Sequence, residues 1–126
     1  MFRDTKAFSS FSVDNLAQTR EFYGQTLGLE IEEDPAGPIL KISGGYNILM
    51  YPKDNHQPAT YTVLNFPVKN IDQAVDMLVS KGIVFEHYDD ITDEKGIARG
   101  FPDGQGPNIA WFKDPAGNIL SVLEEG

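Results

Sequence analysis

Few residues of this chain could carry out acid–base or nucleophilic chemistry. The sequence has no cysteine and only two histidines, His56 and His87. His87 precedes Asp89 and Asp90 in the stretch FEHYDD, so a carboxylate could orient its imidazole as a general base. That spacing is common and the signal is weak, and an exposed or locally hydrogen-bonded histidine is the simpler explanation of each position. The histidines alone therefore do not identify a reaction.

A second group of polar residues lies in the least regular stretch, Tyr88–Asn108. It contains four carboxylates of the type that bind divalent cations, Asp89, Asp90, Asp93 and Glu94. Their order does not match the spacing of an EF-hand loop, and a solvated loop is the simpler interpretation. Its part from Gly100 to Gly106 is rich enough in glycine to fold over a cleft as a lid.

Aromatic and small polar residues offer binding rather than catalysis. Three aromatic side chains could stack on a planar or cationic ligand, namely Tyr51, Tyr61 and Trp111. Three polar side chains could orient such a ligand, namely Ser10, Asn65 and Ser121. Each aromatic residue could equally belong to the core, and the sequence leaves that alternative open.

The composition of the chain limits the classes of partner and of site that it can have. Ten basic residues against nineteen acidic ones leave a net charge of −9, which argues against nucleic acid and anionic membranes. The absence of cysteine excludes disulfides, cysteine-bound zinc and thiol nucleophiles. No apolar run is long enough to cross a bilayer, and the start MFRDTKAF does not read as a secretory signal. We therefore expect a cytoplasmic protein.

The elements that must position these residues follow one plan twice. Strand-like and helix-like stretches alternate in the order strand, helix and three strands, and the predicted ranges are 7–13, 15–28, 29–34, 39–43 and 46–51, then 61–68, 70–82, 83–88, 108–113 and 118–124. Laying Phe11–Tyr23 on Phe66–Leu78 gives four identities and four similar pairs. This agreement favours an internal duplication over two unrelated units of like composition.

The duplication predicts an α+β fold of two β-α-β-β-β modules, 7–52 and 60–125, in a single domain over residues 1–126. Residues 52–60, PKDNHQPAT, are the connector. Side chains alternate between the faces of a strand, so one face of each sheet should carry the helix and the other a cleft. The residues expected on the cleft side include Phe8, Ser10, Tyr61, Val63, Asn65 and Ser121.

Three stretches carry a family resemblance: FSVDNLAQTREFYGQTLGLE, FPVKNIDQAVDMLVSKGI and WFKDPAGNILSVLE. Together they resemble the vicinal oxygen chelate superfamily, which includes glyoxalase I, bleomycin-resistance proteins and extradiol dioxygenases. The resemblance covers nearly the whole chain. It implies paired modules that form a cupped mixed sheet with the helices on its outer face.

The resemblance also implies where a metal would bind. Metal-dependent members bring one ligand from each of four strands into the cup, usually histidine or glutamate. The matching positions here hold Phe8, Leu49, Val63 and Ser121. Three have no lone pair, and a serine hydroxyl is a weak donor, so we expect no metal and no cofactor.

The resulting prediction is a metal-independent protein that binds a small organic ligand, similar to the bleomycin-resistance branch. Phe8, Leu49 and Val63 would form the floor of its cleft. The alternative is an enzyme related to glyoxalases or dioxygenases with a non-standard site, and a third reading is a regulatory or structural dimer. The family often pairs as homodimers, and the sequence leaves pairing open.

Overall fold

A computed structural model of the chain describes residues 1–125, so Gly126, the last residue of the predicted domain, lies outside the described part. The chain divides into two compact units, unit 1 from Met1 to Pro58 and unit 2 from Ala59 onward. The boundary falls inside the predicted connector, 52–60. That both units form one domain stays a prediction.

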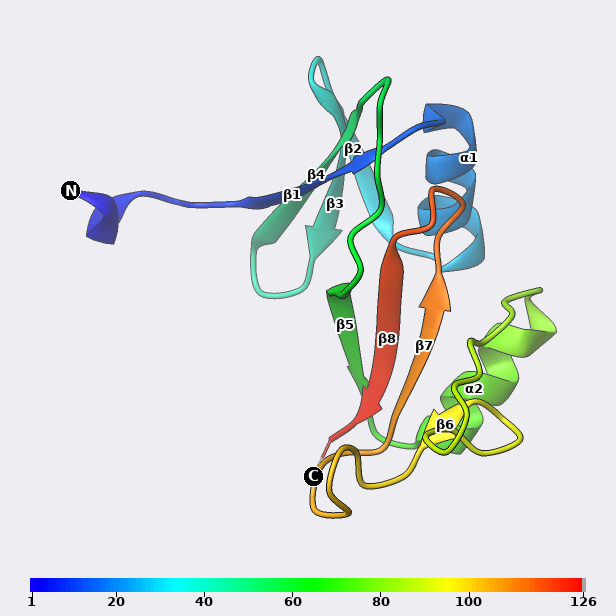
Figure 1. Ribbon diagram of the computed structural model, residues 1–126. Helices are drawn as coiled ribbons and strands as arrows, with labels where there is room; N and C mark the ends of the chain where they lie inside the picture. The colour runs from blue at the N-terminus through cyan, green and yellow to red at the C-terminus, as the bar shows by residue number, and fades with distance from the viewer. Residues whose placement is uncertain (126) are drawn as a thin grey trace. The chain divides into compact units, whose positions relative to one another are not determined.

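Unit 1 contains a four-stranded sheet in the order β1-β4-β3-β2, with β1 parallel to β4 and the other pairs antiparallel (Figure 1). Its elements are η1 Phe2–Asp4, β1 Ser9–Val13, α1 Leu16–Arg20, the π-helical η2 Glu21–Thr26, β2 Glu30–Asp34, β3 Gly37–Ile42 and β4 Tyr46–Pro52. The predicted helix 15–28 is thus present, but it widens to π geometry from Glu21.

Local sequence explains where this helix starts and ends. The side chain of Asn15 accepts a hydrogen bond from the backbone N–H of Gln18 at 2.9 Å, which caps the first turn. Gly28 follows the helix with a φ of 71°, a conformation that glycine adopts at low cost. The buried side chains of Val13, Tyr23 and Leu40 connect strand, helix and sheet in the core of unit 1.

Unit 2 repeats the arrangement with the sheet order β5-β8-β7-β6 and a parallel β5–β8 pair. Its elements are β5 Thr62–Val68, α2 Ile71–Ser80, β6 Ile97–Ala98, β7 Ile109–Lys113 and β8 Ile119–Glu124. Asn70 caps α2 just as Asn15 caps α1, and its side chain accepts from the N–H of Gln73 at 3.0 Å. The helix packs on β7 and β8 and buries Ile71 and Val75.

The predicted strand 83–88 is wrong. Within the described residues this stretch forms a single bridge, between Phe85 and Phe112. The strand that occupies this place in the sheet is β6, which pairs with β7 and lies in the stretch predicted to be irregular. Ile83 and Phe85 are buried and Val84 between them is exposed, which is the two-residue period expected of a strand. The stretch nevertheless lacks the continuous backbone hydrogen bonding of a strand.

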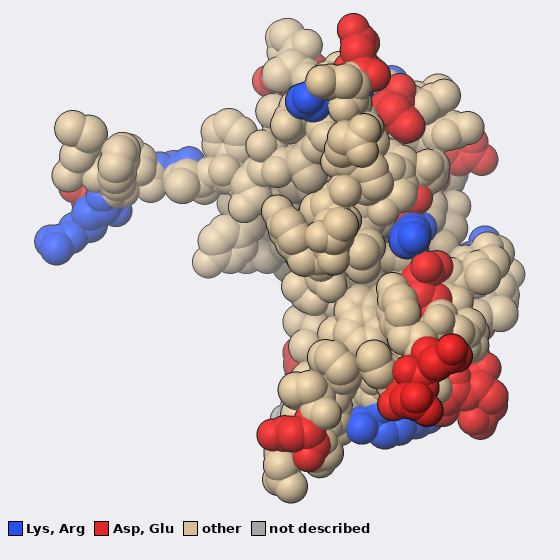
Figure 2. Space-filling model, viewed as in Figure 1, with Lys and Arg blue, Asp and Glu red and all other residues tan. Residues whose placement is uncertain are grey.

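Ion pairs hold the segment around β6 against α2. Asp72 on α2 accepts from Arg99 Nη2 at 2.9 Å and from Lys95 Nζ at 3.1 Å, and Lys95 also pairs with Asp76 at 3.0 Å. The Arg99 and Lys95 side chains hold the pKa of Asp72 well below its usual range. Figure 2 shows acidic and basic side chains side by side in the lower part of the view, where Figure 1 has α2 and β6.

Asp93, which belongs to this segment, stabilises it through hydrogen bonds to its own backbone and side chains. Burial alone would raise its pKa, but the backbone N–H groups of Ile97 and Lys95 and the Arg99 guanidinium outweigh burial and lower it. The N–H of Ile97 donates to Asp93 Oδ1 at 2.9 Å, and Arg99 Nε donates to Oδ2 at 3.2 Å. The stretch between α2 and β7 is therefore tied down in its second half, although it has little regular structure.

The predicted fold class, α+β with two β-α-β-β-β modules of mixed sheet, is confirmed. Among residues 1–125, no helix is long and apolar enough to span a bilayer.

Candidate functional site: an aromatic pocket in unit 2

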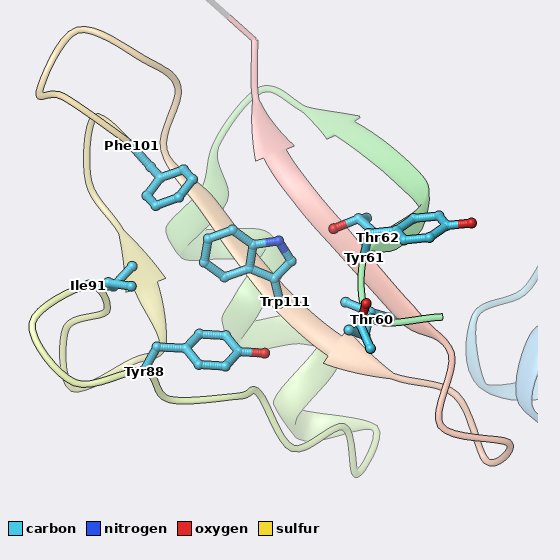
Figure 3. A pocket seen from close by; sticks show the side chains of 8 residues that line it. Thr60, Tyr61, Thr62, Tyr88, Ile91, Phe101 and Trp111 are labelled. Atoms are coloured by element: carbon cyan, nitrogen blue, oxygen red, sulfur yellow. The ribbon is translucent and has the colours of Figure 1, made fainter. Parts of the chain in front are cut away.

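A cavity of about 310 Å³ opens on the sheet of unit 2 (Figure 3). Its lining is aromatic with a few hydroxyl groups, and the residues are Thr60, Tyr61, Thr62, Tyr88, Ile91, Phe101, Trp111 and Ile119. A volume near 300 Å³ is at the lower end for sites that hold small organic molecules.

Trp111 is the centre of this pocket. In Figure 3 its indole ring lies between the rings of Phe101 and Tyr88. The ring centroids are 5.3 Å apart for Phe101 and 5.7 Å for Tyr88, and the planes meet at 85° and 76°. Both are edge-to-face contacts, the arrangement that aromatic quadrupoles favour. The three rings therefore support one another on the open surface of the sheet.

The alternation of β7 turns Trp111 to this face. Its neighbours Ala110 and Phe112 are buried, and Phe112 packs against Phe85 at a centroid distance of 5.5 Å. Trp111 points the other way because successive side chains of a strand leave on opposite faces. Ile119 on β8 and Thr62 on β5 are register partners and extend the same face.

Tyr88 and Ile91 reach the pocket from a tight turn. The N–H of Ile91 donates to the carbonyl of Tyr88 at 3.1 Å, and the N–H of Tyr88 donates to Thr92 Oγ1 at 2.9 Å. Between them, Asp90 has a φ of 64°, in the left-handed region that aspartate tolerates better than most residues. The turn thus places two lining side chains and leaves Asp89 and Asp90 exposed.

Phe101 comes from a loop that is closed by its own hydrogen bonds. Its N–H donates to the carbonyl of Pro107 at 3.0 Å, and the N–H of Gly100 donates to Asn108 Oδ1 at 2.9 Å. Asn108 Nδ2 in turn donates to Glu124 Oε1 on β8 at 3.0 Å. This loop is the predicted lid; it supplies a wall of the pocket, and movement over a cleft stays a prediction.

A row of polar side chains crosses the sheet beside Trp111. Register pairs Asn65 with Ser121 and Ser121 with Trp111. Ser121 is fully buried, and its hydroxyl donates to Asn65 Oδ1 at 2.5 Å. Neither residue is part of the pocket lining. Ser121, one of the four positions where the resemblance implies a metal ligand, thus donates its hydroxyl hydrogen within the sheet.

Four of the five predicted site residues of unit 2 fall into two groups, and Val63 belongs to neither. Tyr61 and Trp111 meet in the aromatic pocket, with Tyr61 exposed at its mouth. A bulge between Thr62 and Leu64 takes Val63 out of register, so Thr62 stands beside Ile119 instead. Asn65 and Ser121 form the polar row. The predicted ligand-binding role of all five stays a prediction.

The predicted site residues of unit 1 lie near one another on its sheet. Ser10 and Leu49 are register partners, and Ile39 continues their row on β3, in the place that Trp111 has in unit 2. Tyr51 pairs with Ser12. Phe8 precedes β1 and is 66% exposed. The roles of these residues also stay predictions.

Sequence reasoning missed two walls of the pocket, Tyr88 and Phe101. Both lie in irregular stretches, whose path depends on hydrogen bonds between distant residues rather than on a period. The signal that could have found them is weak. A large aromatic residue within a polar stretch would be exposed to solvent unless it packs against another part of the protein.

The donor set does not fit the metal that the fold family implies. The side chains of Phe8, Leu49 and Val63 offer no lone pair, and the Ser121 hydroxyl is only a weak neutral ligand. Elsewhere in residues 1–125, no three His, Asp or Glu side chains group closely enough to hold an ion. His56 Nδ1 lies 2.6 Å from Ser12 Oγ, and His87 lines a second cavity of about 380 Å³ beside α2 with Glu94 and Lys95.

Comparison with known proteins agrees with this fold. No protein-family model matches the sequence, and no curated protein matches it. Among solved structures, a protein named for the glyoxalase family from Bacillus anthracis aligns over all of both chains, with 24% identity and a TM-score of 0.70. The fosfomycin resistance protein FosX from Listeria monocytogenes aligns with a TM-score of 0.70 and 15% identity, over 98% of this chain and 94% of its own.

A lactoylglutathione lyase from Agrobacterium tumefaciens is also similar, with a TM-score of 0.66 and 21% identity over 97% of this chain and 96% of its own. Two further matches, from Sphaerobacter thermophilus and Alicyclobacillus acidocaldarius, are named for the glyoxalase, bleomycin resistance protein and dioxygenase superfamily. At these identities the likeness concerns the fold. The chain therefore has the vicinal oxygen chelate fold, as the resemblance in its sequence implied.

Proposed function

We propose that this protein binds a small organic molecule in the aromatic pocket of unit 2 and acts by holding it rather than by converting it. The observation that carries this proposal is the open aromatic cluster around Trp111, between Phe101 and Tyr88. Large aromatic side chains on an open sheet face lose burial energy unless something covers them, and a ligand that covers them recovers it.

The polar groups of the pocket suit orientation of a ligand. Thr60 and Thr62 bring hydroxyl groups to the lining, and Tyr61 and Tyr88 add phenols. The described residues offer no hydrogen-bond partner for the indole N–H of Trp111, which leaves it free to donate to an oxygen of the ligand. A few polar groups in an apolar surround are what fix the pose of a small molecule.

We propose binding without turnover because the chemistry of the site is poor in acids and bases. None of the eight lining side chains is a histidine, carboxylate or lysine, so only the hydroxyl groups of tyrosine and threonine remain for proton transfer within the pocket. Metal independence belongs to the same proposal and rests on the lack of a histidine or carboxylate at the four family positions. A cytoplasmic location and pairing of two copies remain proposals beside it.

Trp111 provides the test, since it is the only tryptophan in the chain. Its fluorescence reports on the pocket alone, and titration with a set of small aromatic and amphipathic compounds should give saturable changes. The variant Phe101→Leu should weaken the same binding, whereas the exposed Tyr46→Leu in unit 1 should leave it unchanged. If no compound changes the emission, the proposal is wrong.

A second candidate is an enzyme related to glyoxalases or dioxygenases with a non-standard site. The observation in its favour is the similarity of fold to a lactoylglutathione lyase and to FosX. It predicts saturable turnover of an adduct between a 2-oxoaldehyde and a thiol, with loss of activity on addition of a chelator.

Native mass spectrometry of gently purified protein separates the two candidates. The mass of the bare chain, or of a bare dimer, agrees with metal-independent binding. A stoichiometric excess that matches nickel, zinc or iron would contradict the donor argument and favour the enzyme. An excess of a few hundred daltons would give the mass of the occupant.

A further inference from the structure

We infer that the aromatic pocket of unit 2 selects an organic cation, namely an alkylated ammonium group such as a trimethylammonium. This inference rests on the proposed function, since it names the class of ligand for the same pocket. It depends on two independent observations, the angles between the rings and the distribution of charge around them.

The angles between the rings suit a rounded group. A flat ligand is best held between two parallel faces, whereas Phe101 and Tyr88 stand at 85° and 76° to Trp111, on either side of it (Figure 3). The indole ring of Trp111 then forms the floor of a corner, and the rings of Phe101 and Tyr88 form its two sides. The face of an aromatic ring attracts a cation through its quadrupole, and tryptophan does so most strongly. A compact, methylated ammonium group fits such a corner because it can contact several rings at once.

The charges around the pocket are suited to a cation. None of the described residues that line it carries a charge, so no lysine or arginine would repel the ligand. Asp89 and Asp90, both exposed, lie in the turn that connects the lining residues Tyr88 and Ile91. Two carboxylates in the turn next to the lining residues would attract a cation without adding charge to the lining itself.

The basic residue of β7 is paired with a carboxylate. Lys113 is two residues along β7 from Trp111 and pairs with Ile119 in the sheet. Its ammonium lies 3.5 Å from Glu86 Oε1. From residue 59 onward the chain has eleven acidic residues and five basic ones, so the surroundings of the pocket are negative overall.

The test compares choline with 3,3-dimethyl-1-butanol, which has the same shape with a carbon in place of the charged nitrogen. Trp111 fluorescence and calorimetry on the full chain measure both affinities. Cation–π attraction predicts that choline binds about 2- to 30-fold more tightly than the neutral compound. Tyr88→Leu should reduce this preference, and Tyr46→Leu, which changes an exposed tyrosine outside unit 2, should leave it unchanged.

A double variant tests the two carboxylates, Asp89 and Asp90, separately. Asp89→Asn with Asp90→Asn should weaken choline binding several-fold at low salt and less at physiological salt, because salt screens exposed charges. Binding of the neutral compound should be unaffected by the change.

The outcomes distinguish this inference from the proposed function. Equal binding of both compounds, or a preference that Tyr88→Leu leaves undiminished, would overturn the cation inference. Binding of neutral planar compounds without any binding of choline would also overturn it and leave the proposed function intact. If neither cations nor planar compounds bind, both proposals are wrong.

Discussion

At the scale of single residues, the same tetrapeptide has two environments. Asp-Pro-Ala-Gly occurs at 34–37 and again at 114–117. Asp34 is exposed and accepts one hydrogen bond, from the N–H of Ala36 at 2.9 Å. Asp114 is 5% exposed and accepts from the N–H of Ala116, the N–H of Asn118 and Asn118 Nδ2 at 2.8–3.0 Å. The buried copy is a structural centre of the last hairpin.

Replacing this buried carboxylate should be costly. Asp114→Ala leaves several buried N–H groups without an acceptor, and we expect it to lower the free energy of unfolding by about 2–4 kcal/mol. Asp34→Ala is the matched control and should cost less than about 1 kcal/mol, since water replaces its single bond. Urea denaturation of both variants measures the difference. Equal losses would contradict the role given to Asp114.

At the scale of elements, the loop that carries Phe101 depends on close backbone contacts. A Cβ at Gly106 would overlap the carbonyl oxygen of Phe101. Backbone atoms cannot move aside as the end of a flexible side chain can, so a larger residue must change the path of the loop.

Gly106→Ala should therefore displace Phe101 from Trp111. We expect a shift in Trp111 emission and a weaker response to ligands, with little change in overall stability because the loop is at the surface. Gly24→Ala is a suitable control, since its Cβ would meet only the flexible Cδ1 of Ile31 at 3.3 Å. Unchanged emission in Gly106→Ala would show that the loop adapts.

The ion pairs between α2 and the segment 93–99 give a dependence on pH. The pKa of Asp72 is lowered in the folded protein. The ionised carboxylate therefore stabilises the attachment of this segment fully above the ordinary carboxyl pKa, near 4. This stabilisation is lost as pH falls through the lowered pKa. Because the group is exposed, the effect should be local.

Hydrogen exchange at Ile97 and Lys95 measures this local effect. In the natural chain we expect these amides to exchange more readily, relative to other amides, as pH falls below about 4. Asp72→Asn should show the faster exchange already at neutral pH and a flatter pH profile. An identical profile in both proteins would show that Asp93 alone holds the segment.

The elements also show what the sequence can predict. The caps at Asn15 and Asn70 and the period of the helices locate α1 and α2 because these signals are local. The strand predicted at 83–88 failed because burial of Ile83 and Phe85 has the same period as pairing. Trp111 and Tyr61 were candidates for the site since they lie on or beside predictable strands. Tyr88 and Phe101 were not, because loop hydrogen bonds to Thr92, Pro107 and Asn108 place them.

At the scale of the whole molecule, the chain consists of two similar units with a connector that carries little regular structure. The stretch from Lys53 to Pro58 is mostly exposed, and it contains the boundary between the units. Proteases cut preferentially at exposed segments of this kind.

Limited trypsin digestion should therefore cut after Lys53 before it cuts within either sheet. Mass spectrometry should then detect cleavage between residues 53 and 54 as the first cut, apart from trimming at the exposed Arg3 and Lys6. Lys41, within β3, is a matched internal site that should be cut later, because the sheet must open first. Early cleavage at Lys41 would contradict the stability assigned to the sheet of unit 1.

The repeated row of residues has a consequence for how this protein tolerates change. Ser10, Leu49 and Ile39 in unit 1 occupy the places that Asn65, Ser121 and Trp111 occupy in unit 2. A duplicated module has two copies of each position, and only one copy needs to take on a task beyond folding. A mutational scan under selection for ligand binding should therefore be asymmetric: permissive to aliphatic exchange at Ile39 and restrictive at Trp111, its structural twin.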